Sequence, residues 1–93
     1  MPIASFNCKR TRQFFETGAH RDFANLRAPL SRKLTTLDEA TSLDDLRALP
    51  GNCLEVLAGD RKGQHSIRVN DQFRLCFTWT SNGPTGVECV DYH

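Results

Sequence analysis

Apolar residues recur at spacings of three and four along the first half of the chain, and at alternate positions along much of the second half. Spacings of three and four place side chains on one face of a helix, whereas alternation places them on one side of a strand. The pattern therefore predicts helices first and a sheet afterwards.

Two helices are predicted before residue 40. Residues 9–17 carry two phenylalanines on a polar run, and Gly18 then favours a helix end. A longer helix is indicated by a stripe of Phe23, Leu26, Leu30, Leu34 and Leu37. Because Pro29 lies within this stripe, the helix either begins near Ala28, with the proline in its first turn, or bends at the proline.

The remaining segments predict an α+β domain. Residues 3–7 suit an edge strand, and Ser42 can cap a short helical turn over residues 43–46. After the break at residues 49–52, strands are expected near 54–57, 65–69, 73–79 and 87–92, with turns between them. We expect an N-terminal strand and two helices on one face of an antiparallel sheet, in a single domain over residues 1–93.

The strand pattern also predicts how two arginines are placed. A three-residue loop at 70–72 pairs Ile67 with Leu75 and keeps the large apolar residues of both strands on one face. The same register sets Arg68 opposite Arg74 on the other face, where two like charges repel. This face is therefore a candidate phosphate site. The alternatives are that the pair splays into water or is neutralised by Glu55, Glu88 or Asp91.

Charge is divided unequally along the chain, although the formal net charge is only +1. Residues 1–37 carry seven basic and two acidic side chains, a net of +5, whereas residues 38–93 have a net of −4. Nine of the twelve basic residues are arginines, which suit two-pronged contact with phosphate or carboxylate. The small net charge is thus no argument against a nucleic-acid partner.

Metal, disulfide and membrane sites are not indicated. Cysteines occur singly, with no C-x-x-C spacing, at Cys8, Cys53, Cys76 and Cys89. No apolar run is long enough to cross a bilayer, and the first residues lack the layout of a secretion signal. We therefore expect a cytoplasmic protein with reduced cysteines and no cofactor.

The end of the chain offers a group of residues that could take part in catalysis, whereas a histidine in the sheet does not. The terminal Asp91, Tyr92 and His93 offer a carboxylate, a phenol and an imidazole for acid–base work or base stacking, although terminal residues are often frayed. His65 alternates in phase with Ile67 and is interpreted as a packed histidine.

Three sequence blocks carry a resemblance to a known family. They are G-D-R-x-G at 59–63, S-I-R-V-N-D-Q at 66–72 and the closing D-Y-H. In this order and spacing they resemble the HigB toxins of bacterial toxin–antitoxin modules, within the RelE/ParE superfamily, over nearly the whole chain. The resemblance implies a ribosome-dependent messenger-RNA endonuclease that needs no metal and inhibits translation. It also implies a helix-turn-helix, HigA-like antitoxin, through which the complex would reach operator DNA.

The resemblance assigns roles to individual residues. Arg74 matches the phosphate-stabilising arginine, and Asp91, Tyr92 and His93 match the C-terminal catalytic cluster. Where some members have a histidine and a nearby lysine, this chain has Glu55 and Ala58. Glu55 is therefore the candidate base. The charge that Ala58 cannot supply would come from Arg61, Lys62 or Arg68.

The antitoxin is expected on the basic helical half, around Arg10, Arg12, Arg27 and Arg32, with a solvated surface as the alternative. Two rival functions stay open. One is a ParE-like toxin that acts on DNA gyrase, and the other is a catalytically weak protein of this fold that binds RNA or an antitoxin.

Overall fold

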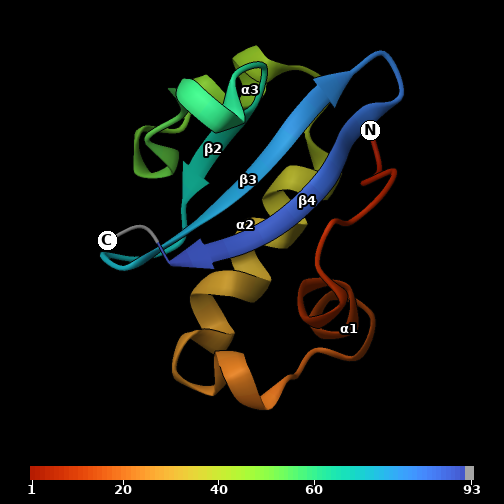
Figure 1. Cartoon of the computed structure of the whole chain (residues 1–93), viewed down its shortest axis with the longest axis vertical. Coiled ribbons are helices and arrows are strands. Elements are labelled where there is room, and N and C mark those ends of the chain that lie inside the picture. The colour runs from red at the N-terminus through yellow and green to blue at the C-terminus, as the bar shows by residue number, and fades with distance from the viewer. Residues whose placement is uncertain (92–93) are drawn as a thin grey trace.

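A computed structural model describes residues 1–91, which form a four-stranded antiparallel sheet and several helices. Figure 1 shows one long helix passing behind the sheet. The helices are α1 (Lys9–Thr17), α2 (Arg27–Glu39) and α3 (Leu43–Arg47), with 3-10 turns η1 (Arg21–Leu26), η2 (Pro50–Asn52) and η3 (Gly59–Arg61). The strands are β1 (Glu55–Val56), β2 (His65–Arg68), β3 (Phe73–Thr80) and β4 (Gly83–Asp91), in the order β1-β2-β3-β4. The predicted α+β class is confirmed.

The first helix forms as its sequence predicts. Gly18 adopts a left-handed conformation with φ of 81°, and its N–H donates to the carbonyl of Phe14 at 2.7 Å. A hydroxyl then fixes the helix to the sheet: the Cys89 N–H of β4 donates to Thr11 Oγ1 at 3.1 Å, and Thr11 is fully buried. This contact satisfies a backbone donor on the outer strand that would otherwise be buried without a partner.

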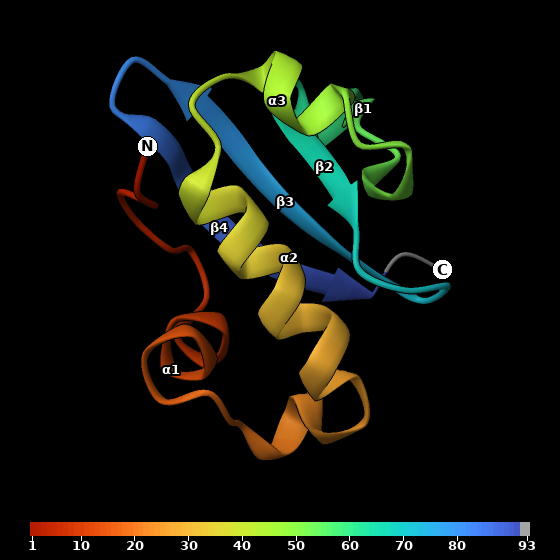
Figure 2. The same cartoon turned by 180° about the vertical axis from the view of Figure 1, so that it is seen from behind.

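Helix α2 packs across one face of the sheet, as the view from behind shows (Figure 2). Pro29 lies in its first turn, so the first of the two predicted alternatives is correct, and η1 leads into the helix instead of a bend within it. The five residues of the apolar stripe are all buried, and they pack against Ile67, Leu75 and Phe77 of the sheet. The opposite face of the sheet is therefore free of α1 and α2.

The hairpin of β2 and β3 has the predicted register. Ile67 pairs with Leu75, Arg68 pairs with Arg74, and the Val69 N–H donates to the carbonyl of Phe73 at 3.0 Å. The Asn70 side chain accepts from the N–H groups of Gln72 and Phe73 and so closes the loop. Both arginines consequently lie on the face away from α2.

Two predicted elements differ in the structure. Residues 4–7 run beside β4 but make a single parallel bridge, between Phe6 and Val87, and no regular strand. Strand β4 begins at Gly83, earlier than predicted, because the turn after β3 needs only Ser81 and Asn82. Proline at the second position of β4 is tolerated, since an edge strand does not need every backbone donor. No helix of residues 1–91 is long and apolar enough to span a bilayer.

Candidate active site

Arg74 is a buried arginine held by several groups on the helix-free face. It is only 8% exposed, and its Nε donates to Ser66 Oγ at 2.8 Å. Its Nη2 donates to the carbonyl oxygens of Cys53 and of Ser66, the latter at 3.4 Å. Cys53 itself has a φ of 44°, a left-handed conformation that is uncommon for residues other than glycine. Strained backbone of this kind is often found at functional sites, and here it turns a carbonyl toward the guanidinium.

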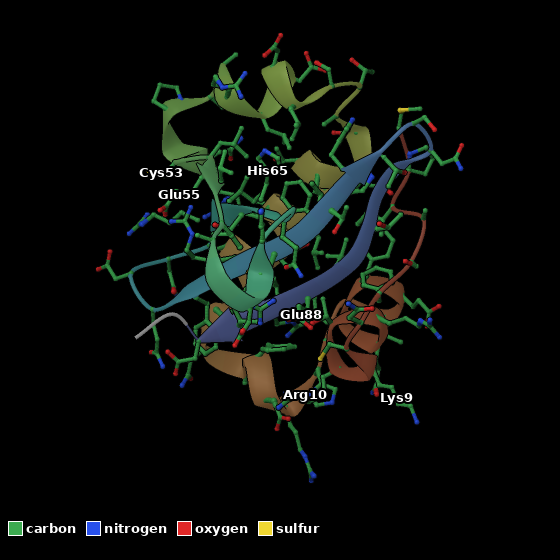
Figure 3. The ribbon with its side chains drawn as sticks, turned by 45° about the horizontal axis from the view of Figure 1, so that its top comes forward. Lys9, Arg10, Cys53, Glu55, His65 and Glu88 are labelled. Carbon is green, nitrogen blue, oxygen red and sulfur yellow. The ribbon has the colours of Figure 1, made fainter. Side chains whose placement is uncertain are left out.

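Glu55 supplies a carboxylate beside this arginine. Its Oε1 lies 3.1 Å from Arg74 Nη2, and the Glu55 side chain is 52% exposed whereas that of Arg74 is 10% exposed. Figure 3 labels Cys53 and Glu55 close together at the β1 edge. A fixed cation therefore lies next to a carboxylate that solvent or a ligand can reach. This arrangement suits proton removal beside a developing negative charge.

The other arginines of this face also have carboxylate partners. Arg68 pairs with Asp71 across the 70–72 loop, and Arg61 Nη1 lies 2.7 Å from Glu88 Oε1. Of the alternatives weighed from sequence, internal neutralisation is therefore what the structure shows for Arg74, through Glu55. Arg68 is neutralised as well, but by a residue that sequence reasoning did not name. Lys62 is exposed on the β1–β2 connection.

The C-terminal candidates are only partly placed. Asp91 pairs with Phe73, and strand alternation puts it in phase with the buried Cys89 instead of with Val90, the partner of Arg74. The Asp91 carboxylate accepts from Gln72 Nε2 at 2.9 Å. The structure thus brings Glu55 to Arg74 but gives Asp91 a place on the other side of the strand. Tyr92 and His93 lie outside the described residues.

Comparison with known proteins places this arrangement in a family. Residues 4–93 match the family described as the RelE-like toxin of the type II toxin-antitoxin system HigB. The chain belongs to this family. Toxin HigB-1 of Vibrio cholerae serotype O1 is 46% identical over 76 residues, which make up 80% of this chain and 80% of that protein. The chain is thus a HigB-like toxin of a type II toxin–antitoxin system.

The fold of this HigB-like toxin agrees with that assignment. A solved YoeB-YefM complex from Staphylococcus aureus contains a chain with a TM-score of 0.61 to it, at 18% sequence identity. The match covers 100% of the toxin and 99% of that chain. At this identity the likeness shows a common fold, and the RelE-like architecture predicted from the sequence is confirmed.

His65 is packed in the toxin, as its alternation predicted. The ring stacks on Phe77 with a centroid distance of 6.3 Å and an interplanar angle of 22°. Burial, with the positive charge of Arg47, lowers the pKa of His65 below its usual value. Both effects favour the neutral imidazole, which suits a residue that packs against an aromatic side chain.

The toxin also has cysteines and possible metal ligands. All four cysteines are free thiols, and burial raises the pKa of Cys89 to about 12. No cluster of histidine, cysteine, aspartate and glutamate within residues 1–91 could hold a metal ion.

The residues predicted to bind an antitoxin lie on α1 and α2. Arg10 Nη1 lies 3.1 Å from Asp22 Oδ2, and Arg27 Nε donates to the carbonyl of Gly18 at 3.2 Å. Arg12 and Arg32 are exposed. This basic surface lies on the helical side of the toxin, whereas Arg74 and Glu55 lie at the helix-free face.

Proposed function

We propose that this HigB-like toxin is an endoribonuclease that cleaves messenger RNA on the ribosome, without a metal ion, and thereby inhibits translation. The observation that carries the proposal is the contact of 3.1 Å between the exposed Glu55 carboxylate and the buried Arg74 guanidinium. Ribonuclease chemistry needs a base and a cation at the same phosphate, and this pair supplies both.

The proposed reaction begins at a ribose 2′-hydroxyl. Glu55 takes the hydroxyl proton as the 2′-oxygen forms a bond to the adjacent phosphorus, and Arg74 stabilises the negative charge that builds up on the phosphorane oxygens. The bond from phosphorus to the 5′-oxygen then breaks, and that oxygen receives a proton. The products are a 2′,3′-cyclic phosphate and a 5′-hydroxyl. We assign the donated proton to Tyr92 or His93, and we give Asp91, which accepts from Gln72 on the other side of β4, no part in this step.

The different anchoring of the two side chains supports these roles. Arg74 is held by Ser66 and by the Cys53 carbonyl as well as by Glu55, so its position does not depend on the carboxylate alone. Glu55 is half exposed and can turn from the guanidinium toward an incoming hydroxyl. Arg61, Lys62 and Arg68 are proposed to contact flanking phosphates. For the two arginines this requires exchanging a carboxylate partner for a phosphate.

Mapping the ends of cellular messages by primer extension, after induced expression of the toxin, tests this function. We expect new 5′ ends within translated codons, and none on the same message with its start codon removed. DNA damage that depends on gyrase, without message cleavage, would instead identify a ParE-like toxin. Absence of both effects would leave a binding protein of the same fold.

The proposed partner is a helix-turn-helix, HigA-like antitoxin in the cytoplasm, through which the complex reaches operator DNA. We place its contact on the basic surface of Arg10, Arg12, Arg27 and Arg32. Charge supports this choice, since the side chains of residues 1–37 carry a formal net charge of +5. Such a surface attracts an acidic partner.

Reversing two of these charges, with Arg12→Glu and Arg32→Glu together, is expected to weaken the complex about tenfold or more, because attraction becomes repulsion at exposed positions. Titration calorimetry against the purified antitoxin measures the change. Arg47→Glu is the matched control, since Arg47 is an exposed arginine on α3 outside this surface. Equal affinity of the double variant and the unsubstituted toxin would refute the placement.

A further inference from the structure

Lys33 of helix α2 and Arg74 of β3 both donate hydrogen bonds to the turn at residues 52–53. Its Nζ donates to Asn52 Oδ1 at 2.7 Å, and the fully buried Asn52 donates in turn to the carbonyl of Leu46 at 3.0 Å. The next residue, Cys53, gives its carbonyl to Arg74. Lys33 and Arg74 therefore bind consecutive residues, whose Cα atoms are about 3.8 Å apart.

Lys33 differs from the arginines of the site in its charge balance. Arg61, Arg68 and Arg74 each lie beside a carboxylate, whereas no carboxylate within residues 1–91 pairs with Lys33. A neutral amide oxygen accepts its hydrogen bond but cancels none of its charge. The ammonium group thus leaves a net positive charge at the edge of the site.

Neighbouring groups make this charge unfavourable in the toxin alone. Partial burial lowers the pKa of Lys33, and the positive charges of Arg32 and Arg68 lower it further, while Cys53 acts in the opposite direction. The charged form of Lys33 is therefore disfavoured by burial and by neighbouring positive charge. A bound anion would favour the charged ammonium.

We propose that Lys33 binds a backbone phosphate of the RNA next to the one that is cleaved. This subsite rests on the proposed ribonuclease function and extends it, because it gives the bound RNA a path over the protein. The path runs from Arg74, past Cys53, toward α2. A phosphate suits the position better than a protein carboxylate because the lysine adjoins the turn that carries Arg74. An RNA strand positioned for cleavage must pass such a neighbour.

Two variants and a control test the subsite. Lys33→Met removes the charge and keeps most of the aliphatic stem, and Lys33→Arg keeps the charge. Lys9→Met removes a lysine from the exposed start of α1 and matches the change in net charge. The probe is a single-stranded RNA oligonucleotide with 2′-deoxyribose at the cut position, which cannot be cleaved. Its binding is followed by fluorescence anisotropy over a range of salt concentrations.

Lys33→Met is expected to reduce the slope of log affinity against log salt by about 0.7, the value for one lost phosphate contact on a single strand. On programmed ribosomes it should raise KM about tenfold and leave kcat nearly unchanged, because the contact binds substrate and transition state alike. Lys33→Arg should restore both quantities, and Lys9→Met should change neither.

An unchanged salt slope for Lys33→Met would overturn the proposal. A fall in kcat and in melting temperature that Lys33→Arg does not repair would do the same, by assigning the lysine to support of the turn. Weaker antitoxin binding with an unchanged slope would move it to a protein interface. If the unsubstituted toxin cuts no message, the proposed function fails, and the slope on the oligonucleotide still decides whether Lys33 binds phosphate.

Discussion

Arg74→Lys is expected to lower the rate of message cleavage by about 10²–10³-fold while the toxin stays folded. Lysine keeps the positive charge near Glu55, but its single ammonium cannot reproduce a planar fork that reaches Ser66, the Cys53 carbonyl and a phosphate together. Single-turnover cleavage on programmed ribosomes gives the rate, and thermal unfolding reports the fold.

Alanine at this position is a poorer test because it changes two properties at once. Arg74→Ala removes the charge and also leaves the Ser66 hydroxyl and the Cys53 carbonyl without their donor, at a cost of about 1–3 kcal/mol in unfolding free energy. Arg47→Lys serves as the control for Arg74→Lys, since Arg47 is exposed and pairs with Asp44 on its own helix. Cleavage by Arg74→Lys at the unsubstituted rate would leave Arg74 a structural anchor and nothing more.

The parts of the fold that follow from strict alternation could be predicted. The pairing of Arg68 with Arg74 depends only on keeping Ile67 and Leu75 on one face, because a slip of one residue exchanges the faces. The apolar stripe that continues along α2 could be predicted in the same way, from the regular spacing of its apolar residues. Its one open point was Pro29, because a proline is tolerated in the first turn of a helix and bends a helix elsewhere.

Contacts between distant segments could not be predicted in this way. Lys33 and Asn52 are 19 positions apart, and a solvated lysine on a helix gives the same sequence pattern as one that caps a buried amide. Ser66 likewise looks like an ordinary strand residue until Arg74 is seen to lie against it. The face of Asp91, by contrast, follows from alternation, since Asp91 is in phase with the buried Val87 and Cys89.

The sequence left several carboxylates as possible partners of Arg74. The structure reduces their number, and the result bears on the mechanism. Glu88, one of the carboxylates weighed, pairs with Arg61, and Asp91 accepts from Gln72. Glu55 reaches the guanidinium from a strand of only two residues at the edge of the sheet. In the proposed mechanism, a base on such an edge can be presented to a strand of RNA that another particle holds. This fits a toxin that acts on the ribosome.

Glu55→Gln is accordingly expected to reduce cleavage by about 10²–10⁴-fold, the contribution of a general base, and to leave antitoxin binding intact. The amide oxygen can still accept from Arg74 Nη2, so the guanidinium keeps its place while the group that removes the proton is lost. Glu88→Gln is the matched control, because it neutralises another carboxylate paired with an arginine of the same site. Cleavage rates for both variants, with calorimetry against the antitoxin, separate lost chemistry from lost binding. If Glu55→Gln cleaves as fast as the unsubstituted toxin, the base is another group and Glu55 only holds Arg74.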